Sequence, residues 1–171
     1  TEYVQKDPQL ALYAEHMNML MIENDSTLAE FKLSISQKYK RHRPRLLILL
    51  GNPALLMRDE YRELWGDIPI VLCSEENYLG PQETYTKKQA IATADRTPLT
   101  QLADPYNMVL LYSNLYLDEN IQLICHIVPE IKKFIFIGDA RQINQTNNLD
   151  IRNKLKKTHP NVEYQFITPQ D

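Results

Sequence analysis

Polar side chains gather at two points where the chain leaves an apolar run. Gly51-Asn52 follows the apolar run at residues 46–50, and Ser74-Glu75-Glu76-Asn77 follows the run at residues 68–73. Carboxylates, amides and hydroxyls in such positions hydrogen-bond small molecules, and carboxylates also transfer protons. The chemistry that these residue types offer is therefore ligand contact or acid–base catalysis at the ends of predicted strands.

Glu75 and Glu76 are the closest approach to a pair of catalytic carboxylates. Neighbouring residues at a strand end point to opposite sides, so we do not expect these two to share a proton or a metal ion. Asp139, two residues before Arg141, resembles the acidic residue that receiver and haloacid-dehalogenase folds place at a strand end. The usual partners of a phospho-acceptor are not apparent. Asp139 therefore either caps the next segment or contacts a ligand, and the sequence leaves both open.

Other motifs of catalysis or cofactor binding are missing from the sequence. The chain has 4 glycines and none pairs with another at the spacing of a phosphate-binding loop, so no nucleotide site is predicted. The histidines lack metal-ligand spacing. Cys73 and Cys125 also lack it, and free thiols are favoured over a disulfide. We expect neither a metal nor a cofactor. The scattered histidines are His16, His42, His126 and His159.

The composition narrows the classes of partner. The 171 residues carry a net charge of -3, which gives no general attraction to nucleic acid. The basic run at residues 38–45 is typical of a solvated helix end. No apolar run approaches the roughly 20 residues of a membrane-spanning helix, and no signal peptide is visible. Because the chain starts at Thr1 rather than methionine, we expect a domain excised from a longer protein.

Residues 45–78 read as one strand, helix and strand. The apolar run at residues 46–50 suits a parallel strand that is covered on both faces. Asn52 is a good N-cap and Pro53 suits the first helical position, so a helix is predicted from there to the stop at Gly66. A second buried strand follows at residues 68–73. Ligands bind beyond the carboxyl ends of parallel strands, where Gly51-Asn52 and residues 74–77 fall.

The remaining pattern alternates strands and helices. A helix capped by Asp25 or Ser26 runs until Pro44. Residues 75–106 have no sustained period, which is typical of a functional segment or a boundary. Alternation of this kind predicts an α/β fold with a mostly parallel sheet covered by helices on both faces, a three-layer arrangement. The other predicted strands are residues 9–18, 108–112, 133–137 and 162–167, and the other helices are residues 117–128 and 149–158.

The tyrosines are unevenly placed. Five of them lie between the two predicted halves, where flat rings with polar tips suit a cleft for a sugar or another small metabolite. Packing at a domain junction explains them equally well. These residues are Tyr78, Tyr85, Tyr106, Tyr112 and Tyr116.

Three ordered segments resemble a known family. They are PRLLILLGNPAL, GDIPIVLCSEENY and PYNMVLLYSNLYLDENIQLICHIVPEIKKFIFIGDAR, within residues 9–168. The order is similar to that of the periplasmic sensor domains of bacterial membrane-bound, often hybrid, two-component histidine kinases. That family is related to the substrate-binding proteins of ABC transporters with the type I periplasmic-binding fold.

The resemblance implies two flavodoxin-like α/β lobes, joined by a hinge, that bind a ligand between them. Residues 1–104 then form a partial first lobe with the irregular segment 75–106, and residues 105–171 form the crossover and the start of the second lobe. One compact domain is the alternative. The residues that the resemblance implies for ligand binding are Gly51, Asn52, Ser74, Glu75, Asn77, Tyr112, Ser113, Asn114, Asp139 and Arg141.

We therefore expect the extracytoplasmic, ligand-sensing part of a sensor histidine kinase of the inner membrane. The domain itself is expected to catalyse nothing and to bind a sugar or another metabolite, while the full-length receptor is a kinase and a homodimer. The fragment is not expected to enter the membrane. The alternatives are a small soluble α/β hydrolase-type enzyme that uses Asp139 or Glu75, and a module for protein interaction or dimerisation.

Overall fold

The computed structural model describes residues 11–113 and 115–168 of the chain. Helices and strands alternate along it, as in other α/β proteins. In chain order the elements are α1 (Asp25–Tyr39), β1 (Leu47–Leu50), the 3₁₀ helix η1 (Asn52–Met57), α2 (Arg58–Trp65), β2 (Ile70–Ser74), β3 (Tyr78–Leu79), α3 (Gln82–Thr86), the 3₁₀ helix η2 (Thr93–Asp95), β4 (Thr97–Pro98), α4 (Thr100–Ala103), β5 (Met108–Tyr112), α5 (Leu117–Ile127), β6 (Lys133–Ile137), α6 (Gln142–Thr158) and β7 (Glu163–Ile167).

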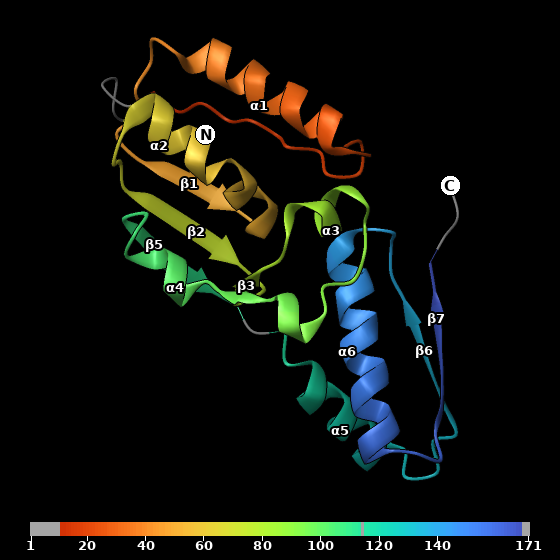
Figure 1. Cartoon of the computed structure of the whole chain (residues 1–171). Coiled ribbons are helices and arrows are strands. Elements are labelled where there is room, and N and C mark those ends of the chain that lie inside the picture. The colour runs from red at the N-terminus through yellow and green to blue at the C-terminus, as the bar shows by residue number, and fades with distance from the viewer. Residues whose placement is uncertain (1–10, 114, 169–171) are drawn as a thin grey trace.

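The described strands form three sheets. β1, β2 and β5 make a parallel sheet in that order, with Leu49, Leu72 and Leu110 side by side in register. β6 and β7 form a second parallel pair, and β3 pairs with β4 antiparallel. The prediction of an α/β chain with mostly parallel strands is confirmed. The parallel strands lie in two separate sheets, because after β5 the chain passes to α5 and leaves the first sheet (Figure 1).

The first sheet and its helices share one apolar core, and we call residues 11–113 the first unit. α1 and α2 lie on one side of the sheet (Figure 1), and Leu28 and Ile35 of α1 are buried there. Trp65 of α2 stacks on Tyr61, with the ring centroids 5.7 Å apart. Burial raises the pKa of the Tyr61 hydroxyl to about 12.

Residues 115–168, which we call the second unit, have a separate apolar core. α6 lies along the β6–β7 pair (Figure 1), and its Ile151 and Leu155 pack with Phe134 of β6. Phe136 stacks on Phe166 of the neighbouring strand with centroids 5.0 Å apart. Stacked cross-strand aromatic pairs of this kind stabilise the small sheet.

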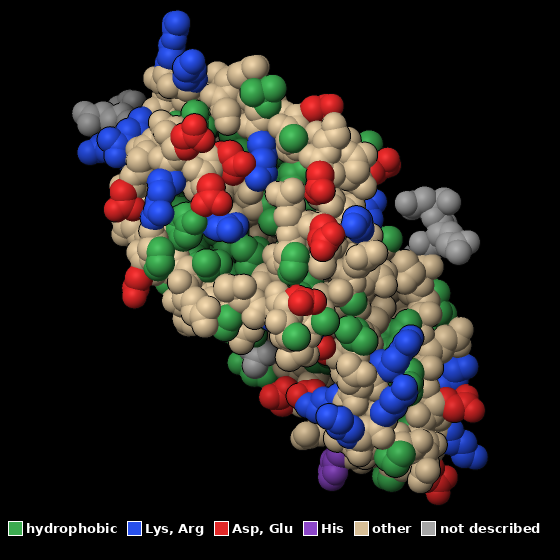
Figure 2. All heavy atoms as spheres, in the orientation of Figure 1, with side chains coloured by type: hydrophobic (Ala, Val, Ile, Leu, Met, Phe, Trp, Pro, Cys, Tyr) green, Lys and Arg blue, Asp and Glu red, His purple; other side chains and the backbone are tan. Residues whose placement is uncertain are grey.

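One face of the first sheet is open among the described residues. Leu50 is 77 % exposed, and Ile48, Val109 and Leu111 are each more than half exposed. Only Leu49 of β1 is buried, so the prediction that this run is covered on both faces is wrong: no described helix lies over the second face. Figure 2 shows charges of both signs interspersed over α1 and α2, on the covered side. The corresponding exposed side chains of the second sheet are Ile135, Ile137 and Ile167.

The helix starts differ from the predicted ones. The N-cap of α1 is Asn24, not Asp25 or Ser26: the Asn24 Oδ1 accepts from the Thr27 N–H at 3.0 Å, and the Thr27 Oγ1 accepts in return from the Asn24 N–H at 3.3 Å. α6 already begins at Gln142, well before the predicted residue 149. Apart from Ile143 its first two turns are polar, so they lack the apolar period that marked the rest of the helix.

The segment after β1 also begins otherwise than predicted. It is a 3₁₀ helix up to Met57, and α2 starts only at Arg58. Asn52 is not the N-cap, because Gly51 takes that position without a side-chain hydrogen bond. The Asn52 side chain is directed to the next strand end instead.

Two weakly patterned stretches complete the fold. The segment 75–106 contains the short elements β3, α3, η2, β4 and α4, so it is more ordered than its composition indicates. The strand predicted at residues 9–18 is wrong for residues 11–18, which form no strand, and its first two residues lie outside the described part.

Candidate functional site

The carboxyl ends of β1 and β2 lie side by side. Gly51 leaves β1 at a φ of +86°, a conformation that favours glycine, and its N–H donates to the Cys73 carbonyl of β2 at 2.8 Å. This turn brings Asn52 against the end of the neighbouring strand. The pairing confirms that the two predicted strand ends form one edge of a parallel sheet.

Asn52 joins the two strand ends through its side chain, which is 2 % exposed. Its Nδ2 donates to the Tyr78 carbonyl oxygen and lies 3.4 Å from both the carbonyl oxygen and the Oε2 of Glu76. Its Oδ1 accepts from the Ser74 hydroxyl. A buried amide must find such partners, since an unpaired one costs about 1–3 kcal/mol.

Ser74 and Glu76 occupy the same side of the strand end. The Ser74 hydroxyl accepts from the Glu76 N–H at 3.0 Å and lies 2.7 Å from the Glu76 carbonyl oxygen. Glu76 is 7 % exposed, and its Oε1 accepts from the Tyr78 hydroxyl at 2.7 Å. We call Asn52, Ser74, Glu76 and Tyr78 the strand-end network.

Burial sets the protonation of the network. Loss of solvent raises the pKa of Glu76, and this effect outweighs the hydrogen bond from Tyr78 and the attraction of Arg96. Burial, together with the neighbouring Glu76, also raises the pKa of the Tyr78 hydroxyl. The Tyr78 hydroxyl therefore stays a hydrogen-bond donor, and the pKa of Glu76 lies above its ordinary value.

Arg96 connects the network to the second unit. Its guanidinium carbon lies 4.5 Å from the centroid of the Tyr78 ring, and its Nη2 donates to Asp150 Oδ1 of α6 at 2.7 Å. The same guanidinium donates to the Ile91 carbonyl oxygen. A path of hydrogen bonds, one cation–π contact and one ion pair, which we call the polar path, therefore runs from Asn52 at the end of β1 to α6.

A second contact joins the same two parts. The Ile91 N–H donates to the Thr146 hydroxyl oxygen of α6 at 3.0 Å, and Gln142 Nε2 donates to the same oxygen at 2.6 Å. Thr146 is fully buried and Gln142 is 7 % exposed. The buried polar residues at the start of α6 thus meet the first unit.

The predicted binding residues divide into three groups. Asn52 and Ser74 belong to the strand-end network and Gly51 shapes its turn, whereas Glu75 and Asn77 next to them are exposed. Tyr112 and Ser113 at the end of β5 are also exposed, although the Ser113 N–H donates to the Ser74 carbonyl at 2.9 Å. Asn114 lies outside the described residues.

Asp139 and Arg141 form a separate local cluster. Asp139 Oδ1 accepts from the Arg141 N–H at 2.9 Å and from Asn144 Nδ2 at 2.6 Å, while its Oδ2 accepts from Arg141 Nε at 2.7 Å. Partial burial acts to raise the pKa of Asp139, but these hydrogen bonds outweigh it and lower that pKa. Ionised Asp139 thus stabilises the turn before α6 through these hydrogen bonds. In the described part of the chain no other carboxylate hydrogen-bonds to it.

Sequence reasoning underrated Glu76 and missed Arg96, Thr146 and Asp150. One signal was available for Glu76: the period of two puts Glu76 on the same side of the strand as Ile70, Leu72 and Ser74, and the structure buries that side. Arg96 and Asp150 lie 54 residues apart in the sequence. No local pattern marks such a pair.

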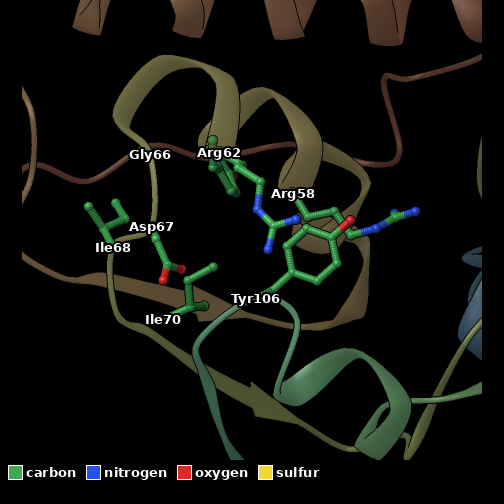
Figure 3. A pocket seen from close by; sticks show the side chains of 8 residues that line it. Arg58, Arg62, Gly66, Asp67, Ile68, Ile70 and Tyr106 are labelled. Atoms are coloured by element: carbon green, nitrogen blue, oxygen red, sulfur yellow. The ribbon is translucent and has the colours of Figure 1, made fainter.

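The five tyrosines do not line one cleft. Tyr85 is buried, and its hydroxyl oxygen accepts from the Gly80 N–H at 3.2 Å. Tyr106 lies instead under Arg62, whose guanidinium carbon is 4.4 Å from the ring centroid. Figure 3 shows the recess beside this pair, closed below by Ile70. Its volume of about 10 Å³ is enough for a single water molecule.

Comparisons with protein families, with curated proteins and with solved structures find no match for this chain. Among residues 11–113 and 115–168, no group of three or more His, Cys, Asp or Glu side chains is placed to hold a metal ion. Cys73 and Cys125 are both free, as the sequence favoured. No helix in the described ranges has the length and apolarity needed to cross a membrane.

Proposed function

We propose that this chain is a ligand-sensing domain in which two α/β units change their relative arrangement when a small molecule binds at the strand ends. In this proposal it forms the extracytoplasmic part of a membrane-bound, dimeric sensor histidine kinase, with lobes of the type I periplasmic-binding kind. The ordered resemblance of the three sequence segments supports that placement. The domain itself performs no catalysis.

The observation that carries the proposal is the polar path from Asn52 to α6. It begins at the carboxyl ends of β1 and β2, where open parallel sheets bind ligands. It ends at Asp150 in the other unit. A molecule that contacts the strand ends therefore lies beside groups that are linked to the second unit through the contact of Tyr78 with Arg96 and the ion pair of Arg96 with Asp150.

The contact between the units suits a shift of population. The two apolar cores are separate, and the bridges described above are polar: the ion pair of Arg96 with Asp150 and the hydrogen bond of Ile91 with Thr146. Polar bridges can be exchanged for ligand contacts without exposing a core. A ligand then shifts the arrangement by its difference in affinity for the two states, and by no more than that.

A thermal-shift screen of sugars, nucleosides and amino acids tests this proposal. A ligand at 100 times its dissociation constant stabilises by about 2.7 kcal/mol, which raises the melting temperature by about 5–10 °C in a chain of this size. Glu75→Gln removes a charge and Asn77→Ala removes an amide, both from exposed side chains beside the network. Each variant is therefore expected to abolish the ligand-induced shift without changing the melting temperature of the free protein.

The matched control is Glu63→Gln, an exposed carboxylate on α2 that is outside the strand-end network. It is expected to leave the ligand-induced shift intact. A screen in which no compound changes the melting temperature contradicts the proposal. A screen whose hits are all unaffected by Glu75→Gln and Asn77→Ala also contradicts it, because those ligands bind elsewhere.

A second candidate function rests on a different observation. The open face of the first sheet, with Ile48, Leu50, Val109 and Leu111 exposed, is the kind of apolar surface that marks a protein interface. An interaction or dimerisation module would use this face. Dimerisation that no small molecule alters would favour this candidate over ligand sensing.

A further inference from the structure

A second hollow lies on the first unit alone. Its volume is about 340 Å³, within the size range of small-ligand sites. It shares no residue with the strand-end network. Its walls come from α1, the η1–α2 junction, the β3–α3 turn, η2, β4 and α4. Its lining includes Lys32, Leu56, Arg58, Leu79, Asp95 and Leu102.

One part of the lining is apolar. Leu56 is 5 % exposed and Leu79 is 6 % exposed, so both belong to the core and present a fixed surface. Leu102 of α4 packs against the same core. This surface suits a short aliphatic body, because burying such a body releases water from apolar area.

Two cations on another part of the lining retain hydrogen-bond donors. The Arg58 guanidinium makes one hydrogen bond, from Nη1 to the Leu55 carbonyl oxygen at 3.2 Å, and lies 3.8 Å from Asp59 Oδ2. Its Nε is buried without a partner. Lys32 Nζ contacts Glu60 at 2.7 Å and Gln82 at 3.4 Å, which leaves one of its three donors. A carboxylate would accept from both cations.

An acidic side chain completes the lining. Asp95 is exposed, and its carboxylate makes no hydrogen bond or ion pair with another residue of the described chain, although its backbone N–H donates to the Ala92 carbonyl oxygen at 3.0 Å. Its carboxylate is placed to accept from an ammonium group. Beside the cations Lys32 and Arg58, it favours a ligand that carries both signs over one with a single charge.

We propose that this hollow binds a small zwitterion with a short aliphatic body, held by its carboxylate at Arg58 and Lys32 and by its ammonium at Asp95. The site goes beyond the strand-end function, because it needs only the first unit. The two sites are tested with different variants. Failure of the zwitterion proposal would therefore leave the strand-end proposal untouched.

Three matched probes test the charges of the ligand. L-norvaline carries both charged groups, pentanoate lacks the ammonium and butylamine lacks the carboxylate, while the aliphatic body is the same. Isothermal titration is expected to show that L-norvaline binds at least about tenfold more tightly than either analogue, a difference of about 1.4 kcal/mol. Equal binding of the three probes, or no binding of L-norvaline at millimolar concentration, overturns the proposal.

Variants locate the binding. Arg58→Gln is expected to lose most of the affinity for L-norvaline, and Asp95→Asn to lower that affinity to the level of pentanoate. Arg62→Gln is the matched control, because Arg62 lies one turn later on α2 and lines only the Tyr106 recess, whereas Arg58 lines both that recess and the hollow. Equal losses in Arg58→Gln and Arg62→Gln would show that the hollow is not the site. If Arg58→Gln does not fold, the Asp95→Asn variant still tests the proposal, because Asp95 is exposed and its substitution is not expected to affect folding.

Discussion

At the scale of single residues, the strand-end network is a set of buried groups that satisfy one another. Asn52 uses both ends of its amide, and Ser74 both donates and accepts. Such networks fix the geometry around them, because each member is costly to leave unpaired. The exposed neighbours Glu75 and Asn77 are therefore held on a rigid turn, which lowers the entropic cost of binding a ligand there.

The raised pKa of Glu76 predicts a pH dependence of stability. Burial favours the neutral carboxyl in the folded chain, so the pKa lies above its ordinary value of 4.5. The contribution to stability is then complete below the pKa of the unfolded chain and is lost as the pH rises through the folded pKa. Glu76→Gln stays neutral, so this part of the pH dependence is expected to disappear.

Urea unfolding at a series of pH values from acidic to neutral measures this effect. The wild-type free energy of unfolding is expected to decline relative to that of Glu76→Gln as the pH rises. Asn77→Ala, in the same turn but without a change of charge, should run parallel to the wild type. Parallel curves for Glu76→Gln and the wild type would contradict the assignment.

At the scale of elements, the ends of helices depend on backbone conformation that only some residues adopt. Gly66 ends α2 at a φ of +71° and a ψ of -152°, and a Cβ there would have room, since the nearest atom is Arg43 Nη2 at 3.9 Å. Gly66→Ala therefore tests conformation without a clash. We expect a loss of about 1–3 kcal/mol in the free energy of unfolding.

Chemical denaturation of Gly66→Ala beside Glu63→Ala measures this cost. Glu63 is exposed on the same helix, where such substitutions change stability by about 0.5 kcal/mol or less. If Gly66→Ala is as stable as Glu63→Ala, the turn after α2 does not depend on glycine.

At the scale of the whole molecule, the open face of the first sheet exposes a row of apolar side chains. Leu50 and Leu111 flank Cys73 in one row of the first sheet and are 77 % and 55 % exposed. We expect the wild-type chain to associate as its concentration rises, because burying this surface removes apolar area from water. Leu50→Lys with Leu111→Lys is expected to shift the chain to monomer and to leave its melting temperature nearly unchanged.

Analytical ultracentrifugation over a range of concentrations reads out this change. The control is Asn77→Lys with Gln101→Lys, which adds the same charge at exposed polar positions away from the open face. It should associate like the wild type. A wild-type chain that is monomeric at every concentration would contradict a role for this face.

The sequence by itself determined the local elements with strong periods. Most strands after residue 45, the helix stop at Gly66 and the parallel α/β class follow from apolar runs and from glycine and proline, which act over a few residues. It also placed Gly51, Asn52 and Ser74 at a common strand edge. These features depend on short-range geometry, which a local pattern contains.

Only the tertiary structure decided how the elements meet. It showed that Asn52 bonds the next strand end rather than capping its own helix, that polar Gln142 and Thr146 begin α6, and that Arg96 reaches Asp150. Each of these depends on partners more than twenty residues away or on burial against another element. Hydrogen bonding and desolvation at such contacts outweigh local propensity, so a single sequence does not reveal them.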